Sequence, residues 1–164
     1  MTATRTMTKQ QWRRERYAAA GDAETRMTAA YDWLRATVTE LPNRRDPDPA
    51  VRDRNAALAR AVTADAVTWL CARAAEMDSV ADMDLRQAAF SASLQKLVRQ
   101  QSEDRERIRR ASEWFRWSAK QLWRRSRRYT VTAEGRQTAL ALREQMIADA
   151  ADYLGSLAER AGDA

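Results

Sequence analysis

The side chains best suited to chemistry in this sequence are the basic and aromatic ones between Arg105 and Tyr129. This stretch holds ten arginine or lysine residues, two glutamates and three of the six tryptophans, and it contains no glycine or proline. Arginine binds phosphate oxygens through paired hydrogen bonds, and tryptophan stacks on nucleobases. Because the whole chain has a formal net charge of only +6, the positive charge is concentrated locally, and we expect a polyanionic partner, nucleic acid above all.

No catalytic constellation accompanies these residues. The chain has no histidine, which removes the commonest general base and zinc ligand, and its one cysteine, Cys71, cannot build a zinc site or an intrachain disulfide. Glycine-rich phosphate loops are also missing. The neighbouring carboxylates Asp82/Asp84 and Glu103/Asp104 lie where helices are expected to begin, so a metal-dependent nuclease built from carboxylates is an alternative that we do not favour. We expect a protein that is not an enzyme, with no metal and no other cofactor.

The elements that position the basic residues are predicted to be helices. Good helix formers dominate the composition, with 4 glycines and 3 prolines in 164 residues. Apolar residues recur at three- and four-residue steps between helix-capping residues, and they predict helices over about 8–20, 23–41, 49–77, 79–101, 103–128 and 133–161. The new helix at 79 is assigned from Asp78, Ser79 and Asp82, which fit a capping box.

We therefore predict an all-α fold, an antiparallel bundle of five to six helices; the smaller number applies if the helix continues through 102–104. All three prolines fall within Pro42–Pro49, the clearest linker in the chain. A single domain over 1–164 is expected, and two lobes, 1–41 and 50–164, joined by the linker 42–49, are the alternative.

A helical projection of the basic stretch separates two faces. With 100° per residue and Phe115 as reference, six residues fall within about 40° of it and form a core-facing stripe: Ile108, Ala111, Ala119, Leu122, Ser126 and Tyr129. Trp114 and Trp123 lie at the edges of this stripe. Trp117 falls about 160° away, among arginines. It either packs against another element of the same chain, which would bury the helix on two sides, or it belongs to a partner surface.

The basic face is the candidate nucleic-acid interface. A solvated face with i, i+4 ion pairs to Glu106 and Glu113 would explain some of its arginines, but two glutamates cannot neutralise ten cations. The expected binding residues are Arg105, Arg109, Arg110, Arg116, Trp117, Lys120, Arg124, Arg125, Arg127 and Arg128, with Arg13 and Arg14 from the basic cluster Arg13–Arg16. Whether the polyanion is RNA, DNA or a heteroduplex stays open.

In size, helicity and the basic segments Arg105–Arg128 and Arg13–Arg16, the chain resembles the small subunits of multi-subunit CRISPR effector complexes. The resemblance is architectural and involves no diagnostic motif. It implies a non-catalytic subunit of an RNA-guided ribonucleoprotein in antiviral defence. Such a subunit contacts the guide–target backbone with one face and a larger protein subunit with another, and its copies stack along the complex.

A second, local resemblance covers Tyr129–Glu144, which is similar to the entry into the last helix of winged-helix repressors and implies a DNA-binding regulator of the winged-helix or helix-turn-helix class. A third alternative is a structural helical protein of a phage or plasmid, in which Trp117 packs against protein and the charge is mostly solvated.

The expected location is the cytoplasm, without membrane association. The longest apolar runs are far shorter than the roughly 20 residues that a membrane span needs, and the first ten residues lack the apolar core of a signal peptide. Cys71 lies in an apolar helical segment and is expected to be a small buried hydrophobe, which fits a reducing compartment.

Overall fold

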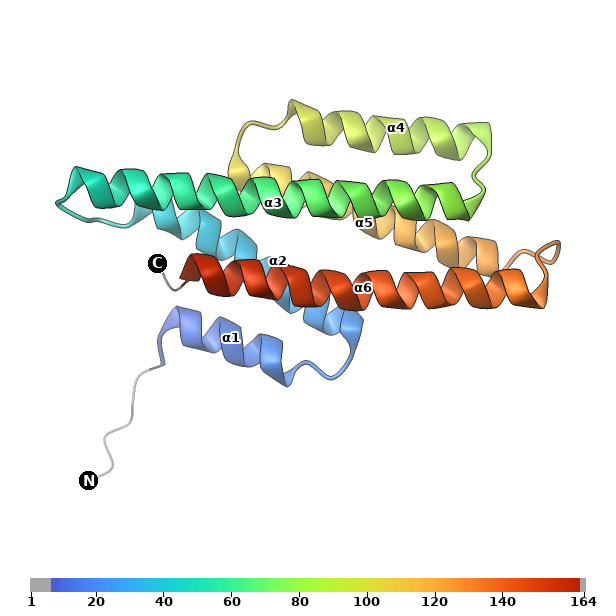
Figure 1. Ribbon diagram of the computed structural model, residues 1–164, viewed down its shortest axis with the longest axis horizontal. Helices are drawn as coiled ribbons and strands as arrows, with labels where there is room; N and C mark the ends of the chain where they lie inside the picture. The colour runs from blue at the N-terminus through green and yellow to red at the C-terminus, as the bar shows by residue number, and fades with distance from the viewer. Residues whose placement is uncertain (1–6, 163–164) are drawn as a thin grey trace, which may run out of the picture.

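The computed structural model describes residues 7–162, and in that range the chain forms six α-helices, one short 3-10 helix and no β-strand (Figure 1). Each α-helix runs opposite to the one before it, so the predicted all-α antiparallel bundle is confirmed. The elements are α1 (Lys9–Ala19), α2 (Ala23–Glu40), the 3-10 helix η1 (Leu41–Asn43), α3 (Pro49–Ala81), α4 (Leu85–Gln100), α5 (Asp104–Ser126) and α6 (Ala133–Gly162).

Most helix starts follow local capping chemistry that the sequence shows. Thr8 caps α1 in a reciprocal box with Gln11, and the Asp22 carboxylate accepts from the Thr25 amide at the start of α2. Asp48 caps α3, with Pro49 in its first turn, where the missing N–H costs no helical hydrogen bond. The chain also breaks between α4 and α5, which makes six helices rather than five.

The predicted helix start at Asp78–Ser79 is wrong. Helix α3 continues through Ala81 and ends at Asp82, whose φ of 51° lies in the left-handed region. The true cap of α4 is Asp84, in a reciprocal box with Gln87. The carboxylate of Asp78 instead accepts hydrogen bonds from Ser91 on α4 and from the indole of Trp114 on α5. A residue that resembles a cap in the sequence is therefore an anchor between three helices.

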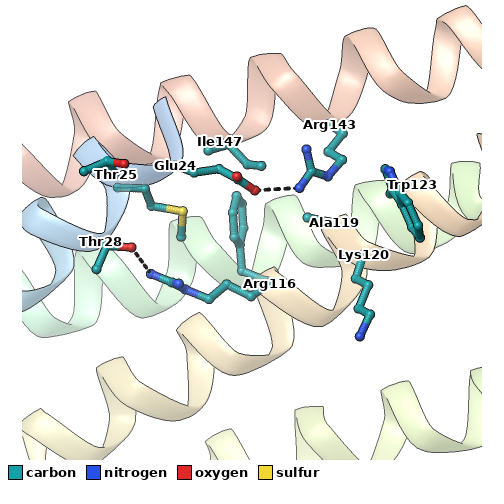
Figure 2. A pocket seen from close by; sticks show the side chains of 11 residues that line it. Glu24, Thr25, Thr28, Arg116, Ala119, Lys120, Trp123, Arg143 and Ile147 are labelled. Carbon is teal, nitrogen blue, oxygen red and sulfur yellow. Dashed lines mark hydrogen bonds and ion pairs between the residues drawn. The ribbon is translucent and has the colours of Figure 1, made fainter. Parts of the chain in front are cut away.

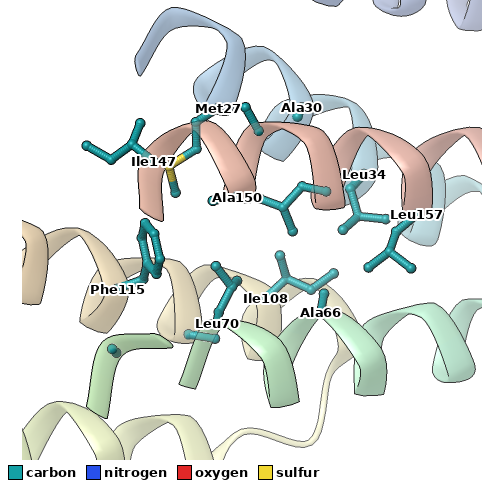
Figure 3. Packing of buried hydrophobic residues seen from close by; sticks show 14 of the residues in the cluster. Met27, Ala30, Leu34, Ala66, Leu70, Ile108, Phe115, Ile147, Ala150 and Leu157 are labelled. Atoms are coloured by element: carbon teal, nitrogen blue, oxygen red, sulfur yellow. The ribbon is translucent and has the colours of Figure 1, made fainter. Parts of the chain in front are cut away.

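The hydrophobic core lies among the four helices α2, α3, α5 and α6 (Figure 3). Helix α1 packs on α2 and α6, and α4 packs on α5, at opposite edges of the bundle (Figure 1). The core cluster includes Trp33 and Leu34, which precede the 42–49 segment, and Leu70, Phe115 and Leu154, which follow it. One core therefore takes side chains from both sides of the predicted linker, while the domain assignments themselves stay predictions.

Helix α5 lies between core helices on one side and α4 on the other. Its predicted stripe is buried from Ile108 to Ser126, whereas Tyr129, beyond the helix end, is 92% exposed. The Nε1–H of buried Trp114 donates to Ser91 Oγ at 3.0 Å and to Asp78 Oδ2 at 3.2 Å. This three-residue network ties α3, α4 and α5 together.

None of the helices between residues 7 and 162 combines the length and the apolar composition that crossing a bilayer requires. Many of their apolar residues belong to the hydrophobic core cluster.

Candidate nucleic-acid interface

The arginines in the N-terminal half of α5 are compensated by carboxylates of the same helix. Arg109 reaches Glu106 at 2.8 Å and Glu113 at 3.0 Å, and Arg110 reaches Glu113 at 3.1 Å. The hydrogen bond from Arg109 lowers the pKa of Glu106 below its usual value and raises that of Arg109. Arg105 is exposed and lies 4.0 Å from Glu106. The expected i, i+4 pairing is present between Arg109 and Glu113. The contacts of Arg109 with Glu106 and of Arg110 with Glu113 join residues three positions apart.

The C-terminal half of α5 has the opposite character. Between Arg116 and Arg128 the sequence carries six basic residues and no carboxylate. Four of them, Arg116, Lys120, Arg124 and Arg128, follow one another at four-residue spacing and share one side of the helix, with Arg128 just beyond its end. At 1.5 Å rise per residue, successive members are about 6 Å apart along the axis. We call these four residues the basic ridge.

The two ends of the basic ridge are anchored and its middle is free. Arg116 donates to Thr28 Oγ1 at 3.3 Å and lies over the Tyr31 ring at 5.7 Å. Arg128 donates to the carbonyl of Asp82 and to Gln87 Oε1, each at 3.4 Å. Lys120 and Arg124 are exposed and make no ion pair or side-chain hydrogen bond within residues 7–162. These two cations are the most available for an external anion.

The remaining two cations of this half flank the ridge. Arg125 pairs with Asp82 at 3.1 Å. Exposed Arg127 lies over the ring of Trp123, with its guanidinium carbon 5.3 Å from the ring centroid. The Trp123 side chain is itself 43% exposed. A solvent-facing indole therefore stands beside unpaired positive charge, which is the combination that binds bases and phosphates.

Trp117, which the helical projection placed opposite the core stripe, is covered by α4. Its ring lies 5.4 Å from that of Phe90 on α4, at an interplanar angle of 44°. Trp117 and Arg124 also line a groove of about 590 Å³ between α4 and α5. The sequence left open whether Trp117 packs within the chain or belongs to a partner surface. Most of its indole packs against the same chain, so α5 is buried on two sides.

The basic cluster near the N-terminus joins helices instead of adding to the ridge. Arg13 forms two hydrogen bonds with Glu40 on α2, at 2.7 and 2.9 Å, and Arg14 contacts Glu159 on α6 at 3.0 Å. The hydrogen bonds between Arg13 and Glu40 lower the pKa of Glu40 below its usual value and raise the pKa of Arg13 above its usual value. Both arginines fasten α1 to the bundle, so the structure does not bring them together with the basic ridge.

A second concave site beside the ridge was not predicted. It has a volume of about 650 Å³ and takes its walls from α2, α5 and α6 (Figure 2). Lys120 and Trp123 on α5 line it together with Glu24 on α2 and Arg143 on α6, which pair with each other across 119 residues of sequence. Contacts over that separation leave no signal in local sequence patterns.

Two observations concern metal binding and thiol chemistry. In the part of the chain that the structure describes, no three His, Cys, Asp or Glu side chains are grouped closely enough to hold a metal ion. Cys71 is half-buried, and desolvation raises the pKa of its thiol to about 11. A thiol with so high a pKa is almost entirely protonated, and hence weakly nucleophilic, at neutral pH.

Comparisons with known proteins add no identity: no protein-family model, no curated protein and no solved structure matches the chain. The local resemblance to winged-helix repressors lacks its wing, because the residues before Tyr129 form α5 and no strand occurs between residues 7 and 162. Thr132 does cap the last helix as expected, since its hydroxyl accepts from the Gly135 amide at 3.0 Å.

Proposed function

We propose that this chain is a non-catalytic subunit that binds the phosphate backbone of nucleic acid through the basic ridge of α5. The observation that carries the proposal is the contrast within one helix: the N-terminal arginines are matched by Glu106 and Glu113, whereas Arg116–Arg128 has six cations and no carboxylate. The axial spacing of about 6 Å along the ridge is comparable with the separation of neighbouring phosphates on one strand.

Helix-dipole compensation explains only part of this charge. Cations are favourable in the last turn of a helix, where Arg124 and Arg125 lie. Arg116 and Lys120 are one to two turns further from the end, beyond the reach of that effect. Contacts with Thr28 and Tyr31 account for Arg116, whereas an external polyanion better explains the placement of Lys120.

A subunit also needs a surface for its protein neighbours, and α4 supplies a candidate. Only Ser91 and Val98 of this helix are buried, whereas Leu85 is 91% and Phe90 51% exposed. Two exposed apolar side chains on a helix beside the basic ridge support the finer proposal of a small subunit in an RNA-guided effector ribonucleoprotein, as the architectural resemblance implies. The alternative proposal of a sequence-specific DNA-binding regulator predicts a different binding profile.

The test is a charge-matched comparison of two triple variants. One replaces Lys120, Arg124 and Arg127 by glutamine; the control replaces Arg52, Arg54 and Arg60 by glutamine, which are exposed on the N-terminal part of α3 and lose the same charge. Affinity for RNA, DNA and hybrid strands is measured by fluorescence anisotropy at several salt concentrations. The first variant, which removes two ridge cations and the flanking Arg127, should bind all sequences more weakly and lose about 2–3 units of the log–log salt slope, at 0.7–0.9 per phosphate contact.

The control variant should retain the wild-type slope. Equal losses in both variants would show that only the overall charge matters and would overturn the ridge proposal. A preference of roughly a thousandfold or more for one DNA site over competitor DNA would instead favour the regulator.

A further inference from the structure

The pocket between α2, α5 and α6 has an apolar floor. Buried side chains from all three helices line it, namely Met27 on α2, Phe115 and Ala119 on α5, and Ile147 on α6. Its volume of about 650 Å³ lies within the range of small-molecule sites and greatly exceeds the space that a single phosphate needs. Whatever occupies it has a flat or apolar part as well as polar groups.

Cations surround the mouth of this pocket. Arg116, Lys120 and Arg143 all line it, against a single carboxylate, that of Glu24 (Figure 2). Arg143 Nη2 contacts Glu24 Oε1 at 2.6 Å, while the Nε of Arg143 is buried without a hydrogen-bond partner. Lys120 belongs both to the pocket and to the basic ridge, so the two surfaces are continuous.

An aromatic wall completes the site. Trp123 stands at one end of the pocket, beyond Ala119, and part of its indole is solvent-exposed (Figure 2). The exposed indole offers a stacking surface for a planar ring. The carboxylate of Glu24 can accept from an exocyclic amino group of a base, while the Arg143 guanidinium, whose side chain is 24% exposed, can donate to a ring or carbonyl acceptor.

We propose that this pocket captures the base of one unpaired nucleotide in a strand whose phosphates lie on the basic ridge; the proposal rests on the function proposed above. The base enters against Trp123 and the apolar floor, and Arg116 and Lys120 hold the flanking phosphates. A paired base does not qualify, because taking it out of a duplex costs a few kcal/mol of unpairing and unstacking. The site therefore favours bulges, loops and single strands over continuous duplex.

The experiment compares three ligands that share one backbone: a continuous duplex, the same duplex with one bulged nucleotide, and that bulge with an abasic nucleotide. Wild-type protein should bind the base-bearing bulge about 5- to 100-fold more tightly than the abasic one, as expected for one stacked base. Trp123→Ala should reduce this ratio to near one while binding the continuous duplex almost as well as wild type.

Trp12→Ala is the matched control, because Trp12 is also exposed, at 56%, and also lies beneath an arginine, with Arg16 5.9 Å from its ring centroid. This variant should keep the preference for the base. Equal affinity of wild type for base-bearing and abasic bulges, with salt-dependent duplex binding intact, would overturn the pocket proposal alone.

Two further outcomes are decisive. If wild type binds none of the three ligands, the proposed function fails together with the pocket. If a free nucleoside monophosphate occupies the pocket as tightly as the bulged strand does, and Trp123→Ala abolishes that binding, the ligand is a free nucleotide and the assignment to a strand is overturned.

Discussion

The indole N–H of one buried tryptophan, Trp114, has hydrogen-bond partners, whereas that of another, Trp33, has none. This difference predicts how phenylalanine replacements at the two positions change the stability of the protein. Trp114 is 3% and Trp33 is 1% exposed. Trp114 Nε1 has acceptors at 3.0 and 3.2 Å, in Ser91 and Asp78, whereas Trp33 Nε1 is buried with no partner. Replacement by phenylalanine removes the N–H in both and leaves a similar small gap.

We expect Trp114→Phe to cost more than Trp33→Phe. Loss of the Trp114 donor leaves Ser91 and the carboxylate of Asp78 short of a hydrogen bond, which costs about 1–3 kcal/mol. In Trp33→Phe the lost N–H had no hydrogen-bond partner, so the only cost is the packing lost because phenylalanine is smaller than tryptophan. This cost is partly offset, because an unsatisfied polar group is no longer buried. The difference in unfolding free energy between the two variants should therefore be about 1–3 kcal/mol.

Denaturant unfolding of both variants measures this difference, and hydrogen exchange locates it. The Trp114 network holds α4, which buries only Ser91 and Val98 of its own residues. Amide protection in α4 should fall about 5- to 150-fold in Trp114→Phe. Equal destabilisation of the two variants, or a loss of protection spread evenly over all helices, would refute the assignment of the network as the anchor of α4.

Two further predictions concern α1. The hydrogen bond from Arg13 lowers the pKa of Glu40 below its ordinary 4.5, so this ion pair stabilises the fold above that pH, and its contribution is lost as the pH falls through the lowered pKa. In urea denaturation at pH 7, Glu40→Gln should therefore be less stable than wild type, and the difference in stability should close at acid pH. A difference that does not depend on pH would contradict this role of the ion pair. A Cβ at Gly155 would lie 2.7 Å from Tyr17 Cζ, so Gly155→Ala should lower the unfolding free energy by about 1–3 kcal/mol, although alanine has the better helix propensity. Thermal or denaturant unfolding measures this cost. Gly162→Ala is the milder control, because its Cβ would meet only the flexible Gln10 side chain; equal costs in the two variants would show that Tyr17 moves aside easily.

Local sequence patterns were sufficient to predict helix starts, the buried face of α5 and ion pairs within a helix, because these depend on residues close in sequence. The helix starts at Asp22, Asp48 and Thr132 are confirmed, and so is the Phe115 stripe from Ile108 to Ser126, because period and capping act within a few residues. The placement of Tyr129 in this stripe is wrong, because α5 ends before it. The pairing of Arg109 with Glu113 also follows from spacing alone. The projection placed Trp117 correctly opposite the core stripe, but it could not show that α4 covers this face.

Contacts between distant segments were beyond the sequence. Arg13 and Arg14 have the same composition signal as the α5 cations, yet Glu40 and Glu159 neutralise them across 27 and 145 residues. Asp78 has the pattern of a helix cap but sits inside α3, because Ser91 and Trp114 use its carboxylate. Tertiary partners, which no local pattern specifies, decided which basic residues remain available.

The basic ridge is unfavourable for the isolated helix, and this favours a role outside the fold. Like charges at i, i+4 destabilise a helix by about 0.2–0.5 kcal/mol per pair, and the ridge places Arg116, Lys120 and Arg124 in two consecutive pairs of this kind. The first half of the same helix shows the favourable alternative, because the carboxylate of Glu113 accepts hydrogen bonds from both Arg109 and Arg110. A carboxylate at the Lys120 position would relieve two repulsions at once. A bound polyanion would also relieve both, which is why this charge pattern favours the proposed binding role.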